Sequence, residues 1–144
     1  MSAAPAGQVE RLLRKRMPAD LRVRIAAEIV ATYAEVRWRM LRGDVTRVVG
    51  ALRQDAVDVH SPYDAYRIGR RLSDPVRRTL DPLPWDSRCL MRSLVLLRML
   101  ARRGVIAQLV IGVRPGEQFE AHAWVEHDGH PLLPTLGYER LTVL

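Results

Sequence analysis

Residues 85–104 read WDSRCLMRSLVLLRMLARRG, and this stretch decides the fold class. Asp86 or Ser87 can cap the start of a helix, while Gly104 follows a basic last turn, as is typical just past a helix end. The apolar residues between them are dense enough for a helix that is buried over one broad side. The stretch therefore predicts a buried helix with Cys89 in its first turn.

The chain after this helix is predicted to form a small antiparallel sheet. Residues 105–113 are rich in Val, Ile and Leu, as in a buried strand. Residues 119–127 form a second strand, and the Asp-Gly pair at 128–129 is a hairpin signal that leads to a return strand over 130–136. The tail, residues 138–144, can add an edge strand.

The first part of the chain is predicted to be helical. Residues 8–17 form a short basic amphipathic stretch. A longer helix is expected from Asp20 to about residue 42, because apolar residues recur there at helical spacings on one stripe. The stripe consists of Leu21, Ile25, Ile29, Val36 and Met40.

Two further helices are expected before the buried one. Asp44 can cap a helix over residues 45–57, and Ser61 with Pro62 can open another that runs through Leu72. The prolines that follow are expected to break the helical pattern. They are Pro75, Pro82 and Pro84.

The order of elements is helices, then one buried helix, then an antiparallel β-meander, which defines an α+β fold. The 144 residues suit a single domain over 9–144 after a flexible N-terminus at 1–8. Within that domain, residues 9–80 form the helical region and 81–144 the core that holds the candidate site.

Composition and charge narrow the class of protein. An apolar fraction of 48% is typical of a globular chain, and no stretch approaches the roughly 18 apolar residues of a membrane span. The N-terminus lacks the apolar region of a signal peptide, so we expect a cytoplasmic protein.

The net charge of +7 comes from arginine, since Lys15 is the only lysine. Arginines can bind an acidic peptide or partner, although codon bias explains them equally well, and the few aromatic residues argue against nucleic acid.

Cys89 is the only cysteine, which excludes an internal disulfide and a cysteine-cluster zinc site. Such a residue is either an inert buried thiol or a nucleophile. In the first turn of a helix, the dipole and the free N–H groups stabilise a thiolate and can bind the oxyanion of an acyl intermediate. Arg88 and Arg92 add positive charge nearby. The position favours a nucleophile.

A cysteine nucleophile needs an imidazole as its base. His122 is the best candidate, because it lies within a predicted strand between two alanines that leave room for close approach; the alternative is a hydrogen-bonded structural histidine. Trp124 on the same strand face, and Trp85 before the cysteine, can wall the site or belong to the core. The other histidines are expected on the surface: they are His60, His127 and His130.

Three segments carry a family resemblance: Trp85-x-x-x-Cys89-Leu90-x-Arg92-Ser93-Leu94, residues 100–105, and His122-Ala123-Trp124-Val125-Glu126. Together they resemble the lasso-peptide biosynthesis B2 proteins, which belong to the transglutaminase-like superfamily of cysteine peptidase folds. The resemblance covers roughly residues 80–130, while the helical first half is similar mainly in length and character.

The resemblance implies a transglutaminase/papain-like core and a cysteine peptidase without cofactor or metal. Such an enzyme would remove the leader from a ribosomally made lasso-peptide precursor, with Cys89 as nucleophile and His122 as general base and acid. The implied partners are the precursor peptide, a separate leader-binding B1 protein and, as a further candidate, the ATP-dependent lasso cyclase. The composition, independently of the resemblance, leads us to expect no nucleic-acid and no membrane partner.

The group that orients His122 is left open by the sequence. The family usually has an aspartate on the next strand, but that region here reads Leu132-Leu133-Pro134-Thr135. If 128–129 is a two-residue turn, Pro134 or Thr135 lies across from His122. The candidates for a third member are Glu120, at roughly 7 Å along the strand, Asp128 and Thr135, with Asp86 and Glu139 also open, whereas Glu126 at roughly 13 Å is too far.

Two alternatives to a peptidase follow from the same residues. A non-catalytic adaptor or assembly module of this fold is favoured by the missing aspartate. An acyltransferase would use the same Cys–His pair with an amine in place of water.

Overall fold

The computed structural model describes residues 18–54, 61–82, 88–116, 118 and 120–144. Its helices are α2 (Ala19–Met40), α3 (Val45–Leu52), α4 (Pro62–Leu80) and α5 (Arg88–Arg102). Its strands are β1 (Gln108–Arg114), β2 (Glu120–His127), β3 (His130–Pro131) and β4 (Glu139–Val143). The predicted α+β class is confirmed. The predicted N-terminal boundary and the basic stretch at 8–17 lie outside the described residues.

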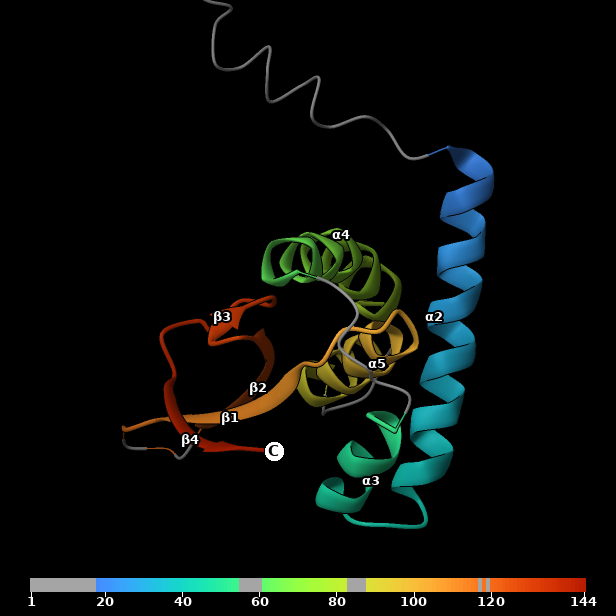
Figure 1. Cartoon of the computed structure of the whole chain (residues 1–144). Helices are drawn as coiled ribbons and strands as arrows, with labels where there is room; N and C mark the ends of the chain where they lie inside the picture. The colour runs from blue at the N-terminus through green and yellow to red at the C-terminus, as the bar shows by residue number, and fades with distance from the viewer. Residues whose placement is uncertain (1–17, 55–60, 83–87, 117, 119) are drawn as a thin grey trace, which may run out of the picture.

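Helix α5 lies at the centre of the molecule, with α2, α3 and α4 around it and the sheet on the remaining side (Figure 1). The prediction of a buried helix is confirmed, because the side chains from Leu94 to Leu97 are at most 1% exposed. Each such side chain stabilises the fold by roughly 1.5–3 kcal/mol. The helix ends where predicted: Gly104 has a φ of 72°, and the N–H of Val105 donates to the carbonyl of Leu100.

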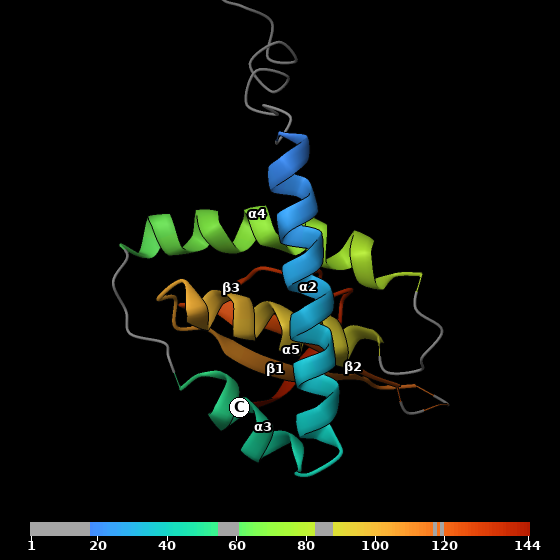
Figure 2. The same ribbon diagram turned by 90° about the vertical axis from the view of Figure 1, so that its right-hand side faces the viewer.

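Helix α2 crosses α5 steeply and packs on it through part of its length (Figure 2). Of the predicted apolar stripe, Ile29 and Val36 are fully buried, but Leu21 is 41% exposed because the first turns of α2 extend past the rest of the molecule. Arginines of α5 reinforce the contact. Arg103 donates to both carboxylate oxygens of Glu28, at 2.8 and 2.7 Å, and Arg102 donates to Glu35 at 2.6 Å.

The starts of α3 and α4 agree with the predicted caps. The Asp44 side chain accepts from the N–H of Arg47 at 2.9 Å, and the Ser61 hydroxyl accepts from the N–H of Asp64 at 3.2 Å. Helix α3 ends at Leu52, before the predicted end, and residues 55–57 lie outside the described part.

The prediction that Pro75 breaks the helical pattern is wrong, because Pro75 lies inside α4. A proline there removes one helical hydrogen bond, which costs about 3 kcal/mol in an isolated helix. Beyond it, however, Val76 is fully buried and Leu80 is 3% exposed, so the last turn of α4 is held by the core. Tertiary packing thus overrides the local preference. Pro82 comes after the helix end, and Pro84 is outside the described residues.

The sheet is antiparallel, with strand order β3-β2-β1-β4. The predicted hairpin at 128–129 is confirmed: Asp128 and Gly129 have φ values of 51° and 76°, as a type I′ turn requires, and His127 pairs with His130. The predicted tail strand is β4, which returns to pair with β1 rather than extending from β3.

The return strand predicted over 130–136 is wrong beyond Pro131. One further backbone bond, from the N–H of Leu132 to the carbonyl of Val125, continues the ladder. Leu132 and Leu133 are then buried in the core, and the regular pairing with β2 ends. Burial of these two leucines decides the path, because a regular strand would place neighbouring side chains on opposite faces.

Candidate active site

Cys89 is the second residue of α5 and is half-buried against the core. The N–H groups of the first turn have no partner within the helix, and they carry the positive end of its dipole. Helix α5 packs directly against β2. Trp85, Asp86 and Ser87, with the side chain of Arg88, lie outside the described residues. Arg92 forms an ion pair with Asp81, so its charge is directed to the end of α4 rather than to the cysteine.

His122 lies on β2, half-buried, and its ring is fixed by three contacts. Nε2 lies 2.8 Å from the carbonyl oxygen of Pro134. The ring stacks on Trp124 with a centroid distance of 5.8 Å, and it lies 5.1 Å from the ring of Tyr138. A carbonyl oxygen only accepts, so Nε2 is the donor and carries the proton in neutral imidazole. Nδ1 is then the basic nitrogen of His122.

Trp124 is held beneath His122 by its own polar contacts. Its side chain is 2% exposed, and Nε1–H donates to Glu126 at 2.8 Å. Glu126 is also buried and is paired with Arg140 at 2.5 Å. Glu126 therefore positions the tryptophan and is not a partner of His122. Trp124 is both part of the core and the wall of the site.

Gly112 makes room for this arrangement. It lies directly opposite His122 in the β1–β2 register. A Cβ at this position would be 2.5 Å from two atoms of the Trp124 ring and 2.7 Å from the carbonyl oxygen of Glu139. Such contacts are about 1 Å shorter than van der Waals separation. A side chain at 112 would therefore displace Trp124, β4, or both.

Tyr138 packs beside His122 and is bonded to Glu120 at the start of β2. Its hydroxyl donates to Glu120 at 3.0 Å, and the Arg114 guanidinium lies 4.4 Å from the centre of its ring. The pKa of the Tyr138 phenol is raised, first by the hydrogen bond to Glu120, then by desolvation and the charge of Glu120, opposed by Arg114; the negative charge of a Cys89 thiolate adds to the rise. Tyr138 is thus held by Glu120 and Arg114 next to the imidazole of His122.

A backbone carbonyl, and not a side chain, makes the contact with His122 that a third catalytic residue was expected to make. The strand register that would place Pro134 or Thr135 across from His122 does not form, because β3 ends at Pro131. The carbonyl oxygen of Pro134 nevertheless reaches His122 and accepts a hydrogen bond from Nε2. Glu120 is engaged by Tyr138, while Asp128 lies in the exposed hairpin turn at the other end of β2. Thr135 is half-buried next to Pro134, and Glu139 is exposed on β4. No signal in the sequence marks a carbonyl for this role.

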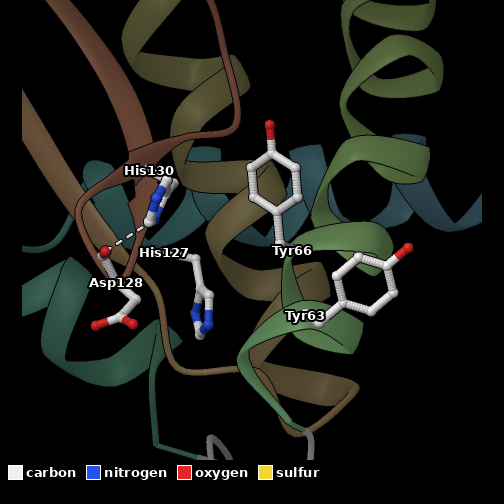
Figure 3. Close-up of a pocket in the computed structure, with 5 residues that line it drawn as sticks. All are labelled: Tyr63, Tyr66, His127, Asp128 and His130. Carbon is white, nitrogen blue, oxygen red and sulfur yellow. Dashed lines mark hydrogen bonds between the residues drawn. The ribbon is translucent and has the colours of Figure 1, made fainter.

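The remaining histidines lie away from this cluster. His130 is exposed, as predicted, but the prediction of an exposed His127 is wrong: it is 7% exposed, and its Nδ1 donates to the carbonyl of Ile106 at 2.8 Å. The start of α4 packs beside this end of β2, where the Tyr66 ring lies 6.1 Å from the ring of His130. A pocket of about 250 Å³ lies here, and it is lined by Tyr63, Tyr66, His127, Asp128 and His130 (Figure 3). His60 is outside the described residues.

Within the described part of the chain, no three His, Cys, Asp or Glu side chains gather as they would around a metal ion. The same residues include no helix with the length and apolar character needed to cross a membrane.

A cysteine at the start of a central helix, packed on a strand that carries a fixed histidine, is the arrangement to compare with known families. The family model described as the transglutaminase-like superfamily matches residues 28–144. The chain belongs to the transglutaminase-like superfamily. The match includes Cys89, His122 and every strand of the described residues. Members of this superfamily often have cysteine-based peptidase or acyltransferase activity. Searches of curated proteins and of solved structures gave no match.

Proposed function

We propose that this chain is a cysteine peptidase that removes the leader from a lasso-peptide precursor, with Cys89 as nucleophile and His122 as general base and acid. The observation that carries the proposal is the hydrogen bond from His122 to the Pro134 carbonyl, because it leaves Nδ1 free of a proton. The resemblance of the segments around Cys89 and His122 to the lasso-peptide B2 proteins favours leader cleavage over other peptidase reactions.

The reaction follows from these two side chains. The thiol proton of Cys89 passes to Nδ1 of His122, and the thiolate sulfur attacks the scissile carbonyl carbon. The N–H groups at the start of α5 are the donors on hand for the oxyanion of the tetrahedral intermediate. The C–N bond then breaks, and His122 gives its proton to the leaving amine, which is the new N-terminus of the core peptide. Water, deprotonated by His122, hydrolyses the thioester, releases the leader and restores the thiol.

A carbonyl in place of a carboxylate suits a thiol nucleophile. The Pro134 oxygen orients the imidazole and selects its tautomer, but it stabilises an imidazolium less than a carboxylate does. A thiol needs less help to ionise than a serine hydroxyl. We propose the precursor peptide and a leader-binding B1 protein as partners, with the lasso cyclase as a further one.

The test is cleavage of a lasso-peptide precursor, in the presence of its leader-binding B1 protein, followed by mass spectrometry. Replacing Cys89 by Ala or His122 by Ala should lower the rate by a factor on the order of 10³. Arg78→Ala, an exposed change on α4, serves as the control and should leave the rate unchanged. Undiminished cleavage by the Cys89→Ala protein would refute the proposal.

The absence of a carboxylate on His122 among the described contacts favours one alternative, a non-catalytic adaptor of the same fold. Alkylation by iodoacetamide at pH 6.5 separates the two. A working pair alkylates faster than a free cysteine peptide, and His122→Ala slows it at least tenfold. An adaptor alkylates at the peptide's rate with or without His122. Addition of an amine nucleophile, with detection of an amide product, distinguishes acyl transfer from hydrolysis.

A further inference from the structure

Helix α2 has a second apolar face that nothing in the described structure covers. Val23 is 68% exposed, Val30 58%, Trp38 52% and Leu41, just past the helix end, 79%. At about 100° per residue, these four side chains fall within a band of about 80°. The band lies opposite the buried face around Thr32. Figure 1 shows that side of α2 directed away from the other elements.

This outer stripe, defined as Val23, Ala27, Val30, Ala34, Trp38 and Leu41, has the shape of a helix-packing surface. Ala27 and Ala34 are exposed and lie between the larger side chains. Small residues between large ones form the grooves that receive the ridge of a neighbouring helix. From Val23 to Leu41 the stripe extends over about 27 Å at 1.5 Å per residue, which gives a partner helix five turns of contact.

Two arginines line one border of the stripe. Arg24 and Arg42 are exposed and, at about 100° per residue, fall on the same flank. The Arg42 guanidinium lies 3.8 Å from the centre of the Trp38 ring. The acids Glu28 and Glu35 do not offset these charges, because arginines of α5 already pair with them. Asp20, in the first turn, is an exposed acid beside this flank. The balance along the stripe is positive.

We propose that the outer stripe of α2 is the docking site for a partner protein that presents an amphipathic helix with acidic flanks. Its apolar face would pack on Val30 and Trp38, and its carboxylates would pair with Arg24 and Arg42. This surface is a docking site independent of the cleavage reaction, so it stands whether or not the proposed function holds.

A second copy of the chain fits this surface less well. In a two-fold symmetric, antiparallel pair of α2 helices, Arg24 of one copy would lie opposite Arg42 of the other. The symmetry would repeat this arginine–arginine contact along the same edge of the helix pair. Like charges placed opposite one another destabilise an interface. The basic residues 8–17 of the chain itself would meet the same repulsion. A flat anionic membrane would not fill the grooves at Ala27 and Ala34.

The test uses two fluorescein-labelled synthetic peptides of 21 residues as probes. Both carry leucines at three- and four-residue spacing; one has Glu on both flanks and the other Lys. By fluorescence anisotropy, the full-length chain should bind the Glu peptide at least tenfold more tightly than the Lys peptide. Val30→Glu should weaken that binding at least tenfold. Leu141→Glu, at a 62% exposed position on β4, is the matched control and should leave it unchanged.

Charge reversal distinguishes specific docking from non-specific hydrophobic binding of the peptides. The Arg24→Glu, Arg42→Glu double variant should prefer the Lys peptide. Equal binding of the two peptides, or full binding by the Val30→Glu protein, overturns the proposal. A dimer in sedimentation that Val30→Glu dissolves would assign the stripe to a second copy, and sedimentation with phosphatidylglycerol vesicles that Val30→Glu abolishes would assign it to a membrane; either result overturns the proposal as well.

Discussion

Replacement of Gly112 by Ala is the sharpest test of how the site is built. The new Cβ would lie 2.5 Å from two atoms of the Trp124 ring, where about 3.5 Å or more is needed. The ring has little room to move, because it is 2% exposed and bonded through Nε1 to the buried Glu126. On the other side, the carbonyl of Glu139 lies 2.7 Å from the Cβ. Overpacking of this kind costs typically 1–3 kcal/mol. We expect a loss of about 2–3 kcal/mol.

The assay is equilibrium unfolding in urea for Gly112→Ala, Trp124→Phe and the double variant. Phenylalanine lacks the distal ring atoms that the new methyl would meet, so the double variant should be more stable than the sum of the single losses predicts, by at least about 1 kcal/mol. Gly50→Ala is the control: it lies in α3 with no atom within 4 Å of the added Cβ, so it should be neutral or stabilise by up to about 1 kcal/mol.

Gly112→Ala should also slow alkylation of Cys89 by iodoacetamide, because the displaced Trp124 no longer supports the His122 ring. A Gly112→Ala protein within 0.5 kcal/mol of the parent, together with no coupling to Trp124→Phe, would refute this account of the site.

Other contacts give further predictions. The side-chain hydrogen bond from Arg103 is the main reason why the pKa of Glu28 in the folded protein is lower than its usual value of 4.5. The ion pair therefore stabilises the fold fully above pH 4.5, and this stabilisation is lost as the pH falls through the lower pKa of the folded state. Glu28→Gln should therefore lower the free energy of unfolding by about 1 kcal/mol at pH 7. Urea titrations at successive pH values should show the difference in unfolding free energy between variant and parent disappearing only below about pH 4.5. Asp44→Ala removes the cap of α3 and should cost about 1 kcal/mol, whereas Asp44→Asn should cost only a fraction of that. Thermal melts followed by circular dichroism measure both variants, and an Ala variant more stable than the Asn variant would show that the cap is unimportant. Gly129→Ala, at a φ of 76°, should cost about 1 kcal/mol in the same melts, and a stabilised variant would contradict the assigned turn.

Several features of the fold were predictable because local sequence dictates them. The apolar density of residues 90–100 requires a buried helix, and Gly104 ends it by adopting a conformation that other residues avoid. Asp128-Gly129 allows the positive φ values of a tight hairpin turn, which fixes the register of β2 and β3. These signals place Cys89 at a helix start and His122 on a strand.

Other features depended on contacts between residues far apart in the chain. Pro75 stays within α4 because Val76 and Leu80 reach the core, and His127 is buried where the start of α4 packs beside the end of β2. The pairing of β4 with β1 is likewise set by which edge of the sheet is free, a property that no single strand encodes.

The sequence by itself determined the candidate nucleophile, the candidate base and the class of fold, because a helix start, a strand and a tight turn are each encoded within a few residues. The tertiary structure alone decided what holds the base. Every residue has a carbonyl, so the composition of 132–135 could not mark Pro134, and only the path of the chain past the buried leucines brings its oxygen to His122. It also decided which of the two apolar faces of α2 is covered by the core and which stays exposed among the described residues.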